Sequence, residues 1–336
     1  MLLLTTLLAC PGGPPATADT GGDTADSGVG SVQWVAVGQG MSAAPLSVWG
    51  TGTDDVWLVG SDAGAGPIWV HYDGGGWTGV TAPDSGDLWW VWGLDDTLYV
   101  CGWGGRIFRY DLATGTVIAD LVDVTTTLYG IWPGAANDVW AVGGNPDAAG
   151  DTAKMFHFDG AVWSEVALPA DVAAQIALFK IWGSSPTDVW AVGSAGTTVH
   201  FDGIEWSSVP TGSIANLFTI NGRYAVGGNI AGTILAWVDG AWVEESPAFS
   251  YAISGVWDDG ANTPIAAGQQ GEVYFRGTQG WEKDERERAT LQDLHSVYTD
   301  PEGGVWAVGG HVSSLPLIQG VLIYAGSRTV PKLEGL

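Results

Sequence analysis

Short runs of alternating apolar and polar residues recur along most of the chain, and glycine-containing turns separate them. The clearest unit spans residues 178–209 and reads LFKIWGSSPTDVWAVGSAGTTVHFDGIEWSSV. Four runs within it, LFKIW, DVWAVG, TTVHFDG and EWSSV, alternate with the period of two that is typical of β-strands. The Asp-Gly pair between the third and fourth runs is a strong signal for a two-residue hairpin turn. The unit therefore predicts four antiparallel strands.

Copies of this unit follow one another along the chain. The second run of each copy ends in a glycine, and this glycine recurs every 34–50 residues at Gly60, Gly102, Gly143, Gly193, Gly227, Gly268 and Gly309. Repeats of about 40 residues that each hold four strands are typical of β-propeller blades. The β-branched and aromatic runs exclude a helical solenoid. We therefore expect an all-β protein, a seven-bladed β-propeller of four-stranded antiparallel blades.

Tryptophan recurs at three matched positions of the unit. These positions, together with Trp34, hold 15 of the 20 tryptophans in the chain. Equivalent rings in successive blades would stack between the sheets, where each can bury about 150–250 Å². We therefore interpret most of the tryptophans as scaffold. The same alignment indicates that Trp89 and Trp237 are core residues.

The segment SVQWVAV, residues 31–37, decides how the ring closes. Trp34 precedes Trp49 by 15 residues, the spacing that separates a fourth-strand tryptophan from the next first strand in other copies, as in Trp77 to Trp92 and Trp242 to Trp257. The last copy, in contrast, ends in SRTVPKLEGL without a fourth-strand tryptophan. We therefore expect the N-terminal strand to complete the last blade. Such closure removes sheet edges that would otherwise pair with other chains.

The repeat resembles kelch-type and related bacterial propeller repeats. The resemblance covers about residues 32–326 and rests on the glycine that ends the second run and on the following YDG…W hairpin. The double glycine of kelch repeats is present at Gly143-Gly144, Gly227-Gly228 and Gly309-Gly310. The resemblance implies the fold and leaves the ligand open.

Charge narrows the possible partners. The 336 residues carry a formal net charge of −26, which would repel a phosphate backbone, so we expect no nucleic-acid partner. The acidity favours cations or basic partners, and it also serves solubility alone. Two cysteines, Cys10 and Cys101, cannot make a disulfide framework.

The N-terminus reads MLLLTTLLAC, and its residues Leu7 to Cys10 resemble the lipobox of bacterial lipoproteins. The resemblance implies cleavage before Cys10 and lipidation of that cysteine, although no Lys or Arg precedes the apolar run. A buried hydrophobic N-terminus is the alternative. Residues 11–30, rich in Pro, Gly, Thr and Asp, are typical of a disordered tether. We thus expect a signal peptide over 1–9, a lipidated Cys10 with a tether over 10–30, and the propeller over 31–336.

Known catalytic and metal-binding motifs are absent from the sequence. His71, His157 and His200 occupy one matched position in different blades, so blade rotation would keep them from binding one metal ion. We expect each to pair with a nearby acceptor, the adjacent turn aspartate being the candidate. The run EKDERER, residues 282–288, is most simply a solvated loop. We expect neither a metal nor a cofactor.

Four residues make up the candidate binding site: Trp90, Trp103, Arg106 and Lys180. Trp90 and Lys180 share a first-strand position that is small or polar in the other copies, as expected for residues that line the central channel. Trp103 and Arg106 lie on the connection between the second and third strands. That connection shares one face, the loop face, with the links between blades, and function normally lies in such loops. Ordinary filling of channel and surface is the alternative interpretation.

Three functions remain open. The first is a non-enzymatic, lipid-anchored module of the bacterial envelope, a monomer whose loop face holds a protein or a glycan. The second is a polysaccharide hydrolase or lyase with loop carboxylates such as Asp95, Asp96, Asp147 and Asp151 as acid and base. The third is a periplasmic assembly scaffold. A close pair of carboxylates with one raised pKa would favour the enzyme. A broad apolar surface on the loop face would favour a protein partner. An isolated shelf of aromatic side chains would favour a glycan.

Overall fold

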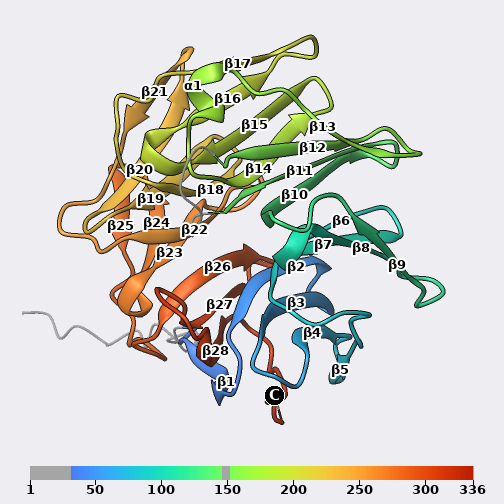
Figure 1. Cartoon of the computed structure of the whole chain (residues 1–336). Helices are drawn as coiled ribbons and strands as arrows, with labels where there is room; N and C mark the ends of the chain where they lie inside the picture. Colours follow the sequence, from blue (N-terminus) through green and yellow to red (C-terminus); the bar gives the residue numbers. More distant parts are fainter. Residues whose placement is uncertain (1–31, 146–151, 336) are drawn as a thin grey trace, which may run out of the picture. The chain divides into compact units, whose positions relative to one another are not determined.

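A computed structural model describes residues 32–145 and 152–335. Within these ranges the strands form seven antiparallel sheets of four strands each, arranged around a central axis (Figure 1). The first strand of each sheet contacts the first strands of both neighbouring sheets, so the contacts run around a complete ring. These first strands are β2 (Pro45–Gly52), β6 (Leu88–Leu94), β10 (Thr127–Ala135), β14 (Leu178–Ser185), β18 (Leu217–Asn221), β22 (Ile253–Trp257) and β26 (Asp293–Thr299). The chain is a seven-bladed β-propeller, as the repeats predict.

The outer strands follow in order within each blade. The second strands are β3 (Asp55–Asp62), β7 (Thr97–Gly102), β11 (Asp138–Gly144), β15 (Asp188–Gly193), β19 (Tyr224–Gly228), β23 (Ile265–Gly268) and β27 (Val305–His311). The third strands are β4 (Pro67–Tyr72), β8 (Arg106–Asp111), β12 (Lys154–Phe158), β16 (Thr198–Phe201), β20 (Gly232–Val238), β24 (Val273–Gly277) and β28 (Ile318–Ala325). The fourth strands are β5 (Trp77–Gly79), β9 (Val117–Leu121), β13 (Trp163–Glu165), β17 (Trp206–Ser208), β21 (Ala241–Glu244), β25 (Gly280–Lys283) and β1 (Val35–Met41).

Helical structure in the described ranges is confined to connections. One short helix, α1 (Ala170–Ala173), lies between β13 and β14. Three 3₁₀ turns link second to third strands: η1 (Trp103–Gly105), η2 (Ser194–Gly196) and η3 (Gln269–Gly271).

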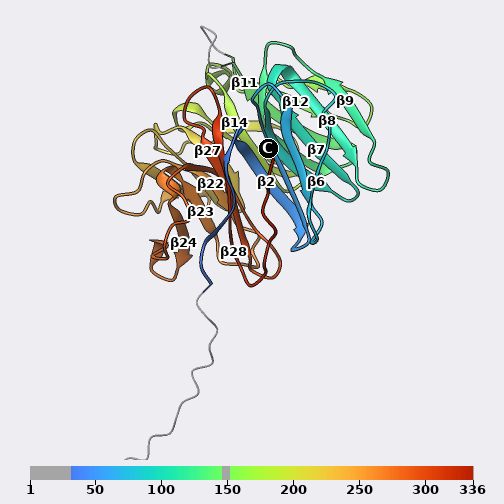
Figure 2. The same cartoon turned by 90° about the horizontal axis from the view of Figure 1, so that it is seen from below.

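The N-terminal strand closes the ring as expected from the position of Trp34. Strand β1 pairs antiparallel with β28, placing Val35 opposite Tyr324 and Ala36 opposite Ile323. The first and last strands of the propeller thus lie side by side (Figures 1 and 2). Closure in this way leaves no first or last blade with an incomplete sheet.

Trp34 is also fastened to the neighbouring blade. Its indole nitrogen donates a 2.6 Å hydrogen bond to Asp284, and the guanidinium of Arg286 lies 5.2 Å from its ring centroid. Arg286 pairs with Asp284 at 2.7 Å and donates to the carbonyl of Val32 at 3.1 Å. The interpretation of residues 282–288 as a solvated loop is therefore wrong for Asp284 and Arg286, because they bind the incoming N-terminal segment.

The glycine that ends each second strand is explained by a close approach of backbone. A Cβ atom at Gly193 would lie 2.3 Å from the carbonyl oxygen of Ala177, which precedes the first strand of the same blade. All seven matched glycines would meet such an oxygen, at 1.8–2.3 Å. Real Cβ atoms do not approach so closely, so this contact accounts for the recurrence of glycine in the repeat.

The matched histidines are structural, but their partner differs from the one expected. His71 binds Asp55 at 2.7 Å, the aspartate that begins the second strand, and stacks on Trp57 with ring centroids 3.9 Å apart. His157 and His200 bind the equivalent Asp138 and Asp188 at 2.6 and 2.7 Å. The turn aspartates instead accept backbone N–H groups of the hairpin, as Asp73 does from Gly75 and Gly76. An aspartate before a turn is commonly used in this way.

Candidate functional site

The central channel opens at two aromatic mouths. The loop-face mouth lies where the first strands begin and is lined by Trp89, Tyr129, Phe179, Lys180, Phe218 and His295. The turn-face mouth lies where the first strands end and is lined by Trp92, Trp182, Trp190, Trp237, Trp242 and Trp257. The turns between first and second strands and the Asp-Gly hairpins share this second face. The two mouths offer cavities of about 320 and 500 Å³.

A β-bulge near the start of each first strand decides which residues face the channel. In β6 the pairing passes from Leu88 directly to Trp90, leaving Trp89 unpaired, and β10, β14 and β18 repeat the pattern. An extra residue in one strand reverses the alternation that follows it. The expectation that Trp90 lines the channel and Trp89 is core is therefore wrong: Trp89 lines the mouth, whereas Trp90 is 7% exposed.

The unpaired residues form a collar of rings around the loop-face mouth. The ring centroids of Trp89 and Tyr129 are 5.0 Å apart, those of Tyr129 and Phe179 5.6 Å, and those of Phe179 and Phe218 5.8 Å. Edge-on and tilted arrangements at these separations are favourable for aromatic side chains. The collar gives this mouth an apolar wall contributed by four successive blades.

Trp90 and Lys180, two of the predicted site residues, do come together. The Lys180 ammonium lies 3.7 Å from the centroid of the Trp90 ring and donates a 2.7 Å hydrogen bond to the carbonyl of Tyr129. Lys180 is 2% exposed and lines the mouth. Burial lowers its pKa to about 7, against a small opposing effect of Cys101. Lys180 thus lines the cavity, while the Trp90 ring against which it packs is buried in the core.

Trp103 and Arg106, the other two predicted residues, form a separate pair at the surface. The Arg106 guanidinium lies 5.5 Å from the Trp103 ring centroid and pairs with Asp84 at 3.0 Å. Trp103 is 54% exposed and lines a second loop-face recess, which shares Trp89 and Tyr129 with the mouth. The four predicted residues thus lie on one face as two pairs rather than as one cluster.

One carboxyl pair on the loop face approaches the arrangement expected of an enzyme. Burial raises the pKa of Asp87, and backbone N–H groups, of which that of Gly86 has the largest effect, lower the pKa of Asp62. Asp87 accepts the backbone N–H of Asp62 at 2.8 Å, while Asp62 accepts that of Gly86 at 2.9 Å. These two hydrogen bonds join the first two blades. The predicted candidates Asp147 and Asp151 lie outside the described residues.

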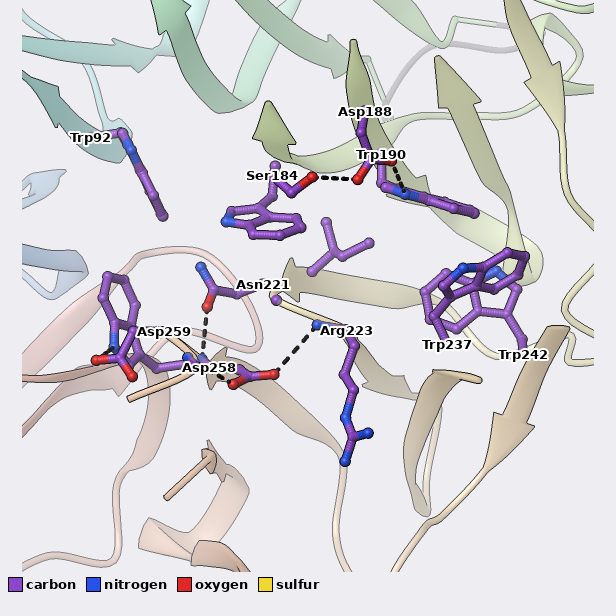
Figure 3. Close-up of a pocket in the computed structure, with 15 residues that line it drawn as sticks. Trp92, Ser184, Asp188, Trp190, Asn221, Arg223, Trp237, Trp242, Asp258 and Asp259 are labelled. Atoms are coloured by element: carbon purple, nitrogen blue, oxygen red, sulfur yellow. Dashed lines mark hydrogen bonds between the residues drawn. The ribbon is translucent and has the colours of Figure 1, made fainter. Parts of the chain in front are cut away.

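The turn-face mouth is richer in tryptophan than the sequence predicts for a functional site. Trp92 and Trp257 pack against each other with ring centroids 5.7 Å apart. Trp237 and Trp242 pack beside Trp190 (Figure 3). Trp92, Trp182 and Trp257 are only half-buried. Three tryptophans interpreted as scaffold therefore present part of their rings to an open cavity.

Polar groups stand between these rings. The side-chain oxygen of Asn221 accepts the backbone N–H of Asp258 at 2.7 Å, and Asp258 accepts that of Arg223 at 3.4 Å (Figure 3). Asp259 is bound by the backbone N–H groups of Ala261 and Asn262. The loops after β18 and β22 thus place an amide, two carboxylates and a guanidinium-bearing residue beside the tryptophans.

Two carboxylates at this mouth, Asp188 and Asp259, have a lowered pKa. Burial acts to raise the pKa of Asp188, but hydrogen bonds from Ser184, His200 and Trp190 outweigh it and leave the pKa lowered. The pKa of Asp259 is lowered in the same way, hydrogen bonds from Asn262, Ala261 and Trp257 outweighing burial. Neither group is suited to donate a proton at neutral pH, since a general acid needs a raised pKa.

Exposed apolar side chains gather on the loop face. Of the large apolar residues in the described ranges that are exposed, nine lie on its connections: Trp103, Val124, Ile176, Ile214, Ile230, Phe249, Tyr251, Leu291 and Leu315. Scattered apolar residues are usual on a surface, but concentration on one face marks an interaction site. No periodicity reveals this surface in the sequence, since its members lie in unmatched loops.

The described ranges contain neither a membrane-spanning helix nor a cluster of metal-ligating side chains. No helix there is long and apolar enough to span a membrane. In the same ranges no group of three or more His, Cys, Asp or Glu side chains is placed to hold a metal ion. Cys101 is buried, and burial raises its thiol pKa to about 12. Cys10 lies outside the described residues.

Neither a protein-family model nor a curated protein sequence matches the chain. Among solved structures, the extracellular domain of the hybrid two-component system BT4673 from B. thetaiotaomicron matches with a TM-score of 0.61 and 14% identity, over 87% of this chain and 39% of that one. The extracellular domain of BT3049 from the same organism matches with a TM-score of 0.61 and 8% identity, over 88% and 42%. The chain thus spans about two fifths of these proteins.

A smaller protein matches over its whole length. The WD40 β-propeller domain of Doa1 gives a TM-score of 0.60 and 14% identity, covering 88% of this chain and 98% of that one. The shared feature is the fold. At these identities the likeness carries no residue of either mouth from one protein to the other.

Proposed function

We propose that this protein is a non-enzymatic binding module of the bacterial envelope that holds a glycan at its turn-face mouth. The observation that carries the proposal is the cavity of about 500 Å³ lined by six tryptophans in the described ranges. This volume is within the usual range of ligand sites. One face of a sugar ring is a patch of C–H groups that stacks on an indole, and its hydroxyls need polar partners at the edge.

The polar groups at this mouth suit that ligand. Asn221 can both donate and accept, while Asp258 and Asp259 accept hydrogen bonds from sugar hydroxyls. The lowered pKa of Asp188 and Asp259 supports binding over acid–base chemistry. The sequence favoured the loop face for such a site, and the proposal moves the glycan to the opposite mouth.

Titration with soluble oligosaccharides tests the proposal. Addition of cellohexaose, xylohexaose, laminarihexaose or chitohexaose to the full chain should change the tryptophan emission saturably. Arg223→Ala, an exposed change at the rim, should weaken binding about tenfold, and Trp257→Ala should abolish it. Trp103→Ala, on the other face, should bind as the parent does. Loss of binding only in Trp103→Ala would contradict the proposal.

A protein partner on the loop face is a second candidate, favoured by the nine exposed apolar residues there. A photo-reactive phenylalanine analogue at Phe249 should crosslink one discrete envelope protein. The same analogue at Ile204, which is 86% exposed on a turn-face hairpin, serves as control. Equal labelling from both positions would rule against a loop-face partner.

A hydrolase on the loop face is favoured only by the raised pKa of Asp87. This hypothesis predicts that the protein releases reducing ends from envelope polysaccharide and that the Asp87→Asn variant does not. Retention of full activity in that variant would exclude Asp87 as the acid.

The envelope location is part of the proposal. It is supported by the lipobox resemblance of residues 7–10 and by the extracellular origin of the bacterial structures with this fold. Cells that express the chain should incorporate labelled palmitate into it, and Cys10→Ser should not be labelled. Labelling of the Cys10→Ser variant would place the lipid elsewhere.

A further inference from the structure

The loop-face mouth contains a buried ammonium without a carboxylate partner. Among the ion pairs of the described residues, Lys154 is matched by Glu165 and Lys283 by Glu272, but Lys180 has none. Its described polar contacts are the Tyr129 carbonyl at 2.7 Å and the Trp90 ring at 3.7 Å. Charges buried to this degree are usually paired, because desolvation is costly. Lys180 is therefore a buried amine that forms no ion pair with any carboxylate of the described residues.

The cavity beside Lys180 has room for an anion. It measures about 320 Å³, and the collar of Trp89, Tyr129, Phe179 and Phe218 lines part of its wall, while polar side chains such as Asn229, Ser254 and Gln269 line another part. A ligand here would meet the aromatic rings of the collar, the ammonium at one point and uncharged polar groups beside it. The matching ligand carries a negative charge at one end of an apolar body.

The other ionisable groups that face this cavity do not form an ion pair with the Lys180 ammonium. The imidazole of His295 donates from Nδ1 to the carbonyl of Leu46 at 2.5 Å, and burial together with the charge of Lys180 lowers its pKa to about 4. It is therefore neutral at pH 7, with a lone pair on Nε2. The Asp293 carboxylate is bound by Ser313 and by the N–H of Gln270. Its side chain lines the cavity without an ion pair to Lys180.

Groups on the neighbouring strands add no competing charge at this end. Cys101, on β7, has a pKa of about 12 and stays a thiol. Asp138 and Asp188 begin β11 and β15 at the turn face, away from the loop-face mouth, and are bound by His157 and His200. The Tyr129 phenol belongs to the collar.

We propose that the loop-face mouth is a binding site for a small organic acid, an aromatic or otherwise apolar carboxylate that pairs with Lys180 and packs within the collar. This site is separate from the glycan mouth and goes beyond the proposed function. Among the described lining residues Lys180 is the one ammonium or guanidinium. A single cation beside an aromatic collar suits a monovalent carboxylate better than a phosphate, which needs several donors.

Binding of such an acid is linked to protons. A carboxylate pairs with the ammonium form, and in the free protein that form is half populated near pH 7. Affinity should therefore fall about tenfold per pH unit above 7 until the pKa of Lys180 in the complex is reached. Complex formation near pH 7.5 should take up protons from the buffer.

Calorimetric titration of the full chain with phenylacetate and indole-3-acetate tests the site. Each acid should bind at pH 6.5 and weaken about tenfold or more by pH 8.5, whereas phenylacetamide, which lacks the charge, should bind at least tenfold more weakly. Heats measured in phosphate and in Tris at pH 7.5 should differ by the proton taken up. Lys180→Met should lose at least tenfold in affinity, and Lys154→Met, which changes an outer-strand lysine, should bind as the parent does.

Several outcomes would overturn the proposal. These are equal binding of phenylacetate and phenylacetamide, undiminished binding by a folded Lys180→Met, or no heat from either acid at 10 mM. If Lys180→Met fails to fold, the two-buffer measurement on the unmodified chain decides alone. Buffer-independent heats would then contradict a role for Lys180.

Discussion

The indole nitrogen of Trp34 donates a 2.6 Å hydrogen bond to Asp284, a residue 250 positions further along the chain. The contact fastens the N-terminal strand to the sixth blade just before that strand completes the seventh. Trp34→Phe removes the indole N–H together with part of the buried ring, and should lower the free energy of unfolding by at least about 1.5–3 kcal/mol, the range for hydrogen bonds to charged groups. Urea denaturation measures this loss. Glu285→Gln, an exposed neighbour of Asp284, should leave the midpoint unchanged.

Close backbone approach predicts a contrast between two glycines. Gly193 has an extended backbone, φ −162°, so alanine is tolerated there conformationally, yet its Cβ would meet the Ala177 oxygen at 2.3 Å. Gly79 has no atom within 4 Å of that position. Gly193→Ala should therefore cost several kcal/mol, of the order of 2–4, as overpacking does, and Gly79→Ala less than about 1. Equal thermal melting of the two variants would contradict the explanation of the repeat glycine.

The Asp55–His71 pair predicts a loss of stability in acid. Burial acts to raise the pKa of Asp55, but hydrogen bonds from His71, Thr51 and Trp57 outweigh it, so the pKa lies below its ordinary 3.8. A lowered carboxyl pKa contributes stability above pH 3.8 that is lost as pH falls through the folded value. Asp55→Asn should thus be less stable than the parent at pH 7, and the difference should shrink below pH 4. Urea midpoints at pH 7, 4 and 3 measure it; a constant difference would contradict the pair.

Lys180 predicts a further gain of stability with rising pH, in a higher pH range than that of Asp55. Its pKa is lowered to about 7 from 10.5, so between these values the unfolded chain binds more protons than the folded one. Stability should rise with pH across this window, at a rate approaching about 1.4 kcal/mol per unit for this group. Lys180→Met should abolish that rise and be the more stable protein at pH 7. Denaturant titrations from pH 7 to 10 check both; an unchanged slope in the variant would mean that Lys180 titrates normally.

The fold prediction rested on the period of the repeat and on the spacing of its tryptophans. The 15-residue interval from Trp34 to Trp49 was enough to place the N-terminal strand in the last blade, because strand lengths and turns repeat. The partner of Trp34 could not be predicted in this way. Asp284 lies in a charged run without a repeat equivalent, and only the fold brings the two together.

The site was harder to predict because a β-bulge in the first strand changes which side chains face the channel. The alignment of the copies put Trp90 in the channel, because its column is mostly small or polar, and Trp89 in the core, but the unpaired residue in β6 exchanges them. The pairing of Trp90 with Lys180 nevertheless agrees with their shared column, since the first strands are innermost and bring equivalent positions near one another at the central axis. The turn-face mouth was missed because the matched tryptophans were fully explained as scaffold. Their partial exposure appears only once the blades are assembled.

A glycan array probed with three proteins tests the account most directly. These are the full chain, a Trp92→Ala, Trp257→Ala variant of the turn-face mouth, and a Trp90→Ala, Trp103→Ala variant of the loop face, each shown to be folded by its melting transition. We predict that the chain and the loop-face variant bind the same glycans and that the turn-face variant binds none. Binding that survives in the turn-face variant, or a folded chain that binds no glycan, would contradict the account.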